Sequence, residues 1–292
     1  MGEVVGAGIV SHVPTIMLPE ETRRELNNGR EISLVPGFHR LREEVLDELK
    51  PDTFIVFDTH CATLLEFFIP SHDRRAGKFT SEELPRGLHQ VPYDMKGSPE
   101  LAKLMAEEIT AKGRRSSTVD DPYLPIHYGT VNVAHYLNRG EEWLSIGMCM
   151  TAEADDYLAV GEGIGNAIAK SDRRVVLLAS GSMSHRFYPL RDILKYEASD
   201  PELVYPGNRE ADMKRLDWFY AGNHASVIDT MDEYYAAKPE GGFGHYLMLV
   251  GAIGGRDCRA KGRLFSDYEN SVGTSQVHVW FDRPDDGWRR AA

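Results

Sequence analysis

The sequence predicts an α/β fold: a single domain with a central mixed β-sheet flanked by helices and a functional site at the strand ends. Three observations predict it. Short apolar runs recur along the chain, segments with helical spacing of apolar residues lie between them, and histidines follow several of the runs. A chain of 292 residues is long enough to bury one large core.

Four apolar runs are expected to be buried strands. They cover residues 4–10, 53–58, 142–150 and 174–180. Each is short and ends at small or polar residues, and several are rich in β-branched residues, which is typical of strands buried on both faces. Their alternation with helices indicates a largely central sheet.

Three segments between these runs are expected to be helices. Residues 36–50 carry apolar side chains near helical spacing, with charges elsewhere. Residues 98–113 begin with a serine N-cap and Pro99 at the first helical position, and they end at Gly113. Residues 155–171 form the third expected helix.

The last third of the chain departs from this alternation. The expected elements are a helix over 208–231 with a break at Gly222-Asn223, an apolar helix over 244–255, and closing strands over 262–271 and 274–282. We expect a single catalytic domain over residues 1–282 and a flexible polar tail over 283–292. The stretch 70–97, rich in proline, glycine and charge, is predicted to be a long functional loop or lid.

Composition excludes several classes of function. A net charge of −12 repels phosphate backbones, so no nucleic-acid partner is expected. No apolar run reaches about 18 residues, and the N-terminus lacks a basic region, so neither a membrane span nor a secretory signal is expected. Cys61, Cys149 and Cys258 have no paired spacing, which favours a reducing cytoplasm over a disulfide framework.

Histidines at three strand ends indicate a functional site. His12 and His60 follow the first two apolar runs, and His185 follows the run at 174–180 after a turn of small residues. Because ligands of open α/β sheets bind outside the carboxyl ends of strands, these side chains are expected to converge. Any one of the eleven histidines, taken alone, is more often a hydrogen-bonded structural residue.

Two imidazoles and one carboxylate on one face of an octahedron form the facial triad of non-haem Fe(II) oxygenases. This triad leaves positions open for a chelating diol and dioxygen. Glu240 offers the carboxylate from an unusual setting, between Pro239 and the Gly241-Gly242 pair and just before an apolar helix. A solvated loop glutamate is the ordinary alternative, but this setting can also hold a ligand inward.

Six segments carry a family resemblance. They are VSHVPTIMLPE (10–20), DTFIVFDTHCA (52–62), YGTVNVAHYLN (128–138), LASGSMSHRF (178–187), PEGGFGHYLMLVGAIGG (239–255) and GTSQVHVWF (273–281). In this order they resemble the class III extradiol ring-cleaving dioxygenases, the superfamily of the protocatechuate 4,5-dioxygenase β subunit. The likeness is closest to the homoprotocatechuate 2,3-dioxygenase branch and spans residues 4–282. The motifs SHVP, FDTH and SGSMSH are specific when they occur together in this order.

The resemblance implies roles for the strand-end residues. It implies that His12, His60 and Glu240 bind Fe(II) and that His185 is the active-site acid and base. Histidine suits proton transfer because its ordinary pKa of about 6.5 lies near working pH.

Four further residues are candidates on weaker grounds. His127 is a second catalytic candidate, which would stabilise bound oxygen or a substrate oxyanion by hydrogen bonding. Tyr128, His135 and His245 are candidates for substrate binding. Tyr128 can equally be a core aromatic residue, and His245 can equally cap its own helix.

The expected reaction is cleavage of a catecholic ring, similar to 3,4-dihydroxyphenylacetate, next to the diol. Both atoms of O2 enter the product, a semialdehyde. The alternatives are the same chemistry on a 2-aminophenol, gallate-like or hydroxypyridone ring, or a metal-dependent hydrolase that uses the same His/His/Glu set. A metal-free binding protein of this fold would be expected to lose ligands, and this chain keeps all three. The resemblance also implies a homo-oligomer.

Overall fold

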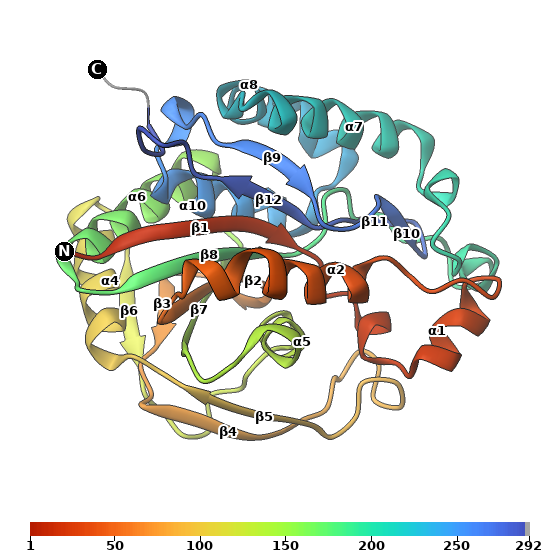
Figure 1. The fold of residues 1–292 in the computed structure, drawn as a ribbon, viewed down its shortest axis with the longest axis horizontal. Helices are drawn as coiled ribbons and strands as arrows, with labels where there is room; N and C mark the ends of the chain where they lie inside the picture. Colours follow the sequence, from red (N-terminus) through yellow and green to blue (C-terminus); the bar gives the residue numbers. More distant parts are fainter. Residues whose placement is uncertain (290–292) are drawn as a thin grey trace.

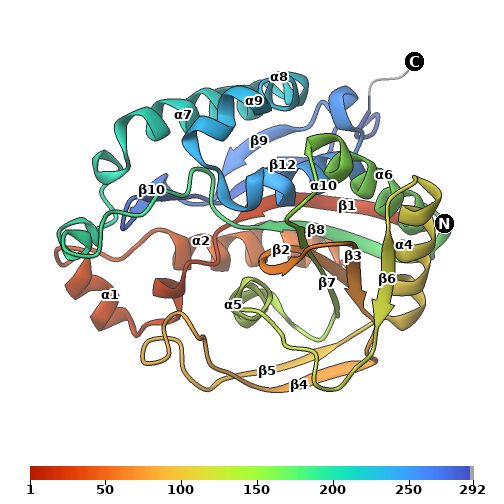
Figure 2. The same cartoon turned by 180° about the vertical axis from the view of Figure 1, so that it is seen from behind.

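An eight-stranded mixed sheet crosses the computed structural model, which describes residues 1–289 (Figure 1). The strand order is β4-β5-β7-β2-β8-β1-β12-β9. The five strands from β5 to β1 run parallel, whereas β4, β12 and β9 pair antiparallel with their neighbours. Helices cover both faces of the sheet (Figures 1 and 2). The predicted fold class is therefore confirmed.

The strands and helices have the following bounds. The large sheet contains β1 (Glu3–Val10), β2 (Thr53–Thr63), β4 (Arg74–Phe79), β5 (Val91–Lys96), β7 (Glu142–Cys149), β8 (Arg174–Ser180), β9 (Lys261–Leu264) and β12 (Val279–Asp282). Two smaller sheets pair β3 (Phe67–Pro70) with β6 (Ser116–Val119) and β10 (Glu269–Ser271) with β11 (Thr274–Gln276). The α-helices are α1 (Glu20–Leu26), α2 (Leu34–Leu41), α3 (Asp47–Leu49), α4 (Pro99–Ala111), α5 (Tyr128–Leu137), α6 (Ala154–Lys170), α7 (Pro206–Ala221), α8 (His224–Asp229), α9 (Met231–Tyr234) and α10 (Gly244–Ala252).

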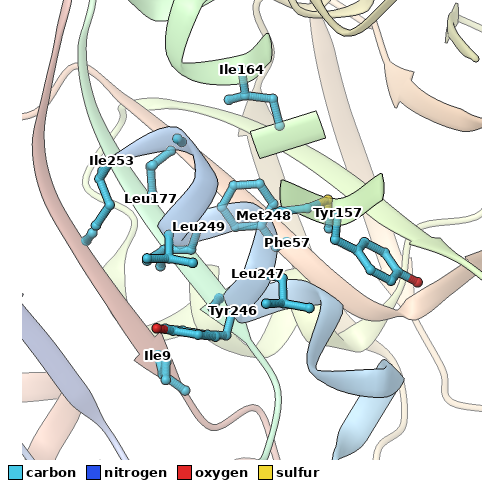
Figure 3. Close-up of a cluster of buried hydrophobic side chains, with 14 of the residues drawn as sticks. Ile9, Phe57, Tyr157, Ile164, Leu177, Tyr246, Leu247, Met248, Leu249 and Ile253 are labelled. Carbon is cyan, nitrogen blue, oxygen red and sulfur yellow. The ribbon is translucent and has the colours of Figure 1, made fainter. Parts of the chain in front are cut away.

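Alternate side chains of the central strands enter two separate cores. In β2, Ile55 and Phe57 face the core that contains α4, α6 and α10, whereas Phe54 and Val56 face the core that contains α2 and α5. All nine residues of α10 are buried, because the helix is largely apolar apart from His245 and lies between the sheet and α6. Figure 3 shows its side chains packed among those of the strands and α6.

Most expected elements are present, and their ends follow known helix signals. The helix predicted at 98–113 is α4, with Pro99 at its first position. The break predicted at Gly222-Asn223 separates α7 from α8, where Gly222 adopts a φ of 68°. The segment 36–50 is helical but divided, since a π-helical turn at Arg42–Leu46 lies between α2 and α3.

Two expectations about secondary structure were wrong. The stretch 70–97 contains the β4–β5 hairpin at one edge of the large sheet, and its charged exposed side chains hid the strand pattern. The strands expected at 262–271 and 274–282 are each divided in two, because β9 and β12 join the large sheet while β10 and β11 pair with each other.

The polar C-terminal segment begins against the body of the protein. The Trp288 indole donates a hydrogen bond to the Val4 carbonyl at 2.9 Å. Of the flexible tail predicted at 283–292, residues 290–292 lie outside the described part of the chain. Within residues 1–289, no helix has the length and apolar character needed to span a membrane.

A buried histidine between β11 and β12 is expected to make stability depend on pH. His278 accepts a hydrogen bond from the Ser11 amide at Nδ1 (3.1 Å) and donates from Nε2 to the Leu34 carbonyl (3.0 Å). Burial lowers its pKa from 6.5 to about 4. The unfolded chain therefore binds the proton more tightly than the folded protein does. The contribution of neutral His278 to the free energy of unfolding is fully present above about pH 6.5. As the pH falls toward 4, this contribution decreases by about 3 kcal/mol in all.

Urea unfolding of the metal-free protein at about pH 7 and about pH 4 measures this effect. We expect the difference in unfolding free energy between the two pH values to shrink by about 3 kcal/mol in His278→Asn. His39, exposed on α2, provides the control variant His39→Asn, which should keep the wild-type difference. An unchanged pH dependence in His278→Asn would contradict the assignment.

Candidate metal centre

Three neighbouring parallel strands bring the predicted ligands together. In the sheet β8 lies between β2 and β1, so their carboxyl ends meet at one edge. His12 follows β1, His60 lies near the end of β2, and Glu240 starts the short 3₁₀ helix η6 (Glu240–Phe243). One ligand atom from each residue lies within 4.8 Å of the others. Glu240 Oε1 is 3.3 Å from His12 Nε2 and 3.6 Å from His60 Nε2.

The hydrogen bonds of His12 leave Nε2 free to bind a metal. Its Nδ1 lies 2.9 Å from Ser180 Oγ, and the Ser180 hydroxyl donates its proton to the Gly129 carbonyl at 2.6 Å. Ser180 Oγ must therefore accept from Nδ1–H, which places the lone pair on Nε2. The Asn132 amide donates to the His12 carbonyl at 2.8 Å and holds the backbone at this strand end.

A bulge in β2 turns His60 toward the cluster. The pairing of β2 with β7 shifts register between Asp58 and Ala62, and the Asp58 carboxylate accepts from the His60 amide at 2.9 Å and from the Thr130 hydroxyl at 2.6 Å. Bulges re-aim side chains in this way. Gly129 allows this close contact, because a Cβ atom there would lie 2.2 Å from Asp58 Oδ1.

Tyr128 lies against both histidine ligands, where the sequence predicted a substrate-binding or core residue. Its ring centroid is 3.8 Å from that of His60 and 5.3 Å from that of His12. Its hydroxyl donates to Glu83 at 2.9 Å, and Glu83 in turn lies 3.3 Å from His60 Nδ1. Sequence reasoning missed Glu83, because it took residues 70–97 for a loop and singled out no acidic residue there.

The carboxylate of Glu240 is held by hydrogen bonds from two strand ends. The Glu240 amide donates to the Met183 carbonyl at 3.0 Å, which ties its backbone to the segment after β8. The Ser182 amide donates to Oε2 at 2.6 Å, and the Thr59 hydroxyl donates to Oε1. The carboxylate therefore has a fixed orientation with Oε1 toward the two imidazoles.

The glycines after Glu240 explain how a charged side chain is turned inward. Gly241 and Gly242 have φ values of 53° and 62°, in the left-handed region that glycine adopts without strain. Phe243 also has a positive φ, at 62°, and its side chain is fully buried. This left-handed turn leads the chain directly from the buried carboxylate into α10.

His185 lies beside the three predicted ligands without joining them. Its Nδ1 is 2.8 Å from Ser182 Oγ and 3.6 Å from Glu240 Oε2. The buried carboxylate of Asp212 supports this turn, since it accepts from the Ser184 amide and hydroxyl at 3.2 and 2.6 Å and from the hydroxyls of Tyr234 and Tyr268. Asp212 was missed in the sequence, where it looks like an ordinary polar residue of a helix.

The electrostatics of the cluster suit a divalent cation. Burial alone would raise the pKa of Glu240, but the imidazoles of His185 and His12 hold it well below its usual value. Burial would lower the pKa of His12, yet Glu240 raises it above normal, whereas burial and His12 lower the pKa of His60. An ionised carboxylate that attracts a proton to a neighbouring imidazole also attracts a metal ion, so the donor set fits the metal that the sequence predicts.

The other three candidates differ in their surroundings. His127 is the half-buried N-cap of α5, and within residues 1–289 no side-chain hydrogen bond, ion pair or ring contact joins it to the ligands. His135 is exposed on α5 with its ring edge against Tyr136. His245 is fully buried on α10, and burial lowers its pKa to about 4. Its Nε2 would lie 2.9 Å from a Cβ atom at Gly181. The proposed roles of all three stay predictions.

One side of the cluster reaches solvent. The side chains of His60 and His185 are 18% and 25% exposed, whereas those of His12 and Glu240 are 5% and 8% exposed. A cavity of about 910 Å³ lies next to the cluster and is lined by Thr59 but by none of these four residues. A small molecule therefore reaches the ligand atoms most directly from the side of His60 and His185.

The sequence of the chain matches one protein family and is similar to named dioxygenases. Residues 6–282 match the family described as the catalytic LigB subunit of aromatic ring-opening dioxygenase. The chain is 30% identical to 3,4-dihydroxyphenylacetate 2,3-dioxygenase of Escherichia coli over 258 residues, which covers 87% of this chain and 91% of that protein. It is 24% identical to the 2-aminophenol 1,6-dioxygenase beta subunit of a Pseudomonas species, over 80% of this chain and 79% of that subunit.

A solved structure shares the fold. An uncharacterized protein of Escherichia coli K12, JW3007, superposes with a TM-score of 0.63 over 94% of this chain and 98% of that one. The two sequences are only 14% identical, so this likeness concerns the fold alone.

Proposed function

The chain belongs to the family of catalytic LigB subunits of aromatic ring-opening dioxygenases, and from this we propose that it opens a catecholic ring next to the diol with both atoms of O2. The resemblance to extradiol dioxygenases that the sequence motifs indicated is thereby confirmed. The observation that carries the proposal is the cluster of His12, His60 and Glu240 at the carboxyl ends of parallel strands, inside the matched region.

We assign the chemistry to four residues. His12, His60 and Glu240 hold the metal, and Fe(II) is the ion proposed, because two imidazoles and one carboxylate form its facial triad. Bound there, Fe(II) supplies the Lewis acidity and redox chemistry that ring opening by dioxygen requires. His185 Nδ1 lies 2.8 Å from Ser182 Oγ, and in the tautomer whose Nδ1–H donates to that oxygen, Nε2 accepts a phenolic proton and returns it later.

The proposed substrate is a 3,4-dihydroxyphenylacetate-like catechol. The support is the identity of 30% with an enzyme named for that substrate, against 24% for the 2-aminophenol enzyme subunit. A 2-aminophenol is the second candidate, since its hydroxyl and amine are placed to chelate the same metal positions. Two arginines that are candidate partners for a substrate carboxylate do not favour either candidate, because Arg74 pairs with Asp94 and Arg186 stacks over Tyr205.

An oxygen-uptake screen tests the proposed function. Protein loaded anaerobically with Fe(II) should consume one O2 for each catechol opened and form a coloured product with 3,4-dihydroxyphenylacetate. Removal of the metal with a chelator should abolish uptake, and ferrous iron with a reductant should restore it. Hydrolysis of an ester or amide without oxygen uptake would instead favour the metal-dependent hydrolase.

Two further properties complete the proposal. The relatives include alpha and beta subunits of 2-aminophenol 1,6-dioxygenase, and we propose that this chain assembles with identical copies, which light scattering would measure. We assign it to the cytoplasm, a location supported by three cysteines that are all free and buried.

A further inference from the structure

We propose that Glu83 is a positioning residue of the metal centre, which orients His60 and thereby sets the affinity of the site for its metal. The inference rests on the proposed function, since it takes His60 to be a metal ligand. It goes further by assigning a role to a residue of the connection between β4 and β5, outside every motif that carries the family resemblance.

The two carboxylate oxygens of Glu83 contact two different residues of the site. Oε1 lies 3.3 Å from His60 Nδ1, and Oε2 accepts from the Tyr128 hydroxyl at 2.9 Å. The Tyr128 ring lies against the His60 imidazole with a centroid distance of 3.8 Å. One Glu83 oxygen therefore lies close to the Nδ1 edge of the imidazole, and the other accepts a hydrogen bond from the tyrosine that packs against the ring.

A small hydrogen-bonded turn carries Glu83 to this position. The Ser81 amide donates to the Leu88 carbonyl at 2.9 Å, and the Ser81 hydroxyl accepts from the Glu83 amide at 3.2 Å. Ser81 and Leu88 are both buried, and Leu88 packs into the core on the α5 side of the sheet. The turn is thus anchored at both ends, although the Glu83 side chain itself is 54% exposed.

The contact at Nδ1 has a defined chemical consequence. A carboxylate at Nδ1 favours the imidazole tautomer that carries its proton there, so that the lone pair lies on Nε2, the atom near Glu240. Ser180 does the same for His12 with a hydroxyl. Removing a residue that contacts a metal-binding histidine in this way typically lowers metal affinity by about 10–100-fold.

The alternative is that Glu83 only ties down its own turn through Tyr128. In that case its removal would lower the stability of the protein without changing how the folded site binds metal. Metal affinity, measured separately from stability, therefore distinguishes a positioning role from a structural one.

Titration of the metal-free protein with Fe(II) under anaerobic conditions, in competition with a chromophoric chelator, tests the proposal. We expect Glu83→Ala to bind Fe(II) about 10–100-fold more weakly than wild type. Glu83→Gln should lose less, because its amide oxygen can take the place of the carboxylate oxygen beside His60 Nδ1. The neighbouring exposed residue gives the matched control Glu82→Ala, which should bind as wild type does.

Spectra and unfolding complete the experiment. The visible absorption of the Co(II)-loaded protein should change in Glu83→Ala and stay unchanged in Glu82→Ala. If wild type binds Fe(II) and Glu83→Ala binds it within twofold, with or without a lower melting temperature, the role of Glu83 is refuted and the proposed function stands. If wild type binds no metal, both proposals fail together.

Discussion

Replacing Glu240 with alanine is expected to reduce Fe(II) affinity by more than about 10²-fold and to abolish ring cleavage. This loss exceeds that expected when a residue that only contacts a metal ligand, such as Glu83, is removed. The carboxylate is the only negatively charged member of the three-residue cluster, and its Oε1 lies within 3.6 Å of both imidazoles. Without it, two neighbouring imidazoles share one site with no charge to offset a divalent cation. The same result is expected for His12→Ala and His60→Ala.

The measurement is metal content after dialysis, together with oxygen uptake in the presence of added Fe(II). Glu269→Gln is the matched control, because Glu269 is also a buried carboxylate but accepts its hydrogen bond from Ser33, away from the cluster. The control should retain iron and activity. Full iron content and wild-type turnover in Glu240→Ala would overturn the assignment of the metal centre.

Replacing His185 with phenylalanine is expected to leave iron in place and slow ring cleavage by about 10²–10⁴-fold. His185 lies beside the ligands, with Nδ1 3.6 Å from Glu240 Oε2, but is not one of the three residues that share a metal position. Phenylalanine fills a similar volume on this part-exposed side of the site, but it cannot hold or release a proton. The loss should therefore appear in kcat, with substrate binding much less affected.

Steady-state kinetics with iron-loaded protein would measure kcat and KM separately, and iron analysis would confirm that the metal is retained. The control is His39→Phe, an exposed histidine of α2 whose ring contacts Tyr136. Turnover by His185→Phe equal to that of the control would exclude His185 from proton transfer.

The central strands and the cluster were predictable because both depend on local patterns with a simple spatial rule. Apolar runs identify the parallel strands, and parallel strands place their carboxyl ends at one edge, so His12 and His60 were expected to converge at that edge. Glu240 was suggested by its proline and glycine neighbours, and those glycines do adopt the left-handed turn that directs the carboxylate inward.

The parts that escaped prediction depend on contacts between distant segments. Edge strands such as β4 carry exposed charged residues, so their sequence does not alternate as a half-buried strand does. In the sequence, Glu83 and Asp212 look like ordinary acidic residues. Only the fold brings Glu83 to His60 and Tyr128, and Asp212 to Ser184. His60 was expected after its strand, but a bulge extends β2 beyond it.

The place of β1 in the sheet governs the order in which the molecule can assemble. Its two neighbours are β8 and β12, so the first strand to leave the ribosome pairs with segments made some 170 and 270 residues later. A nascent chain that has emerged only through β8 can complete the parallel strands, but β1 is then an open edge and Glu240 has not yet been synthesised. A metal ion held by His12, His60 and Glu240 would therefore be captured only after residue 240 has been made, and it would link the segment after the first strand to one from the last third of the polypeptide.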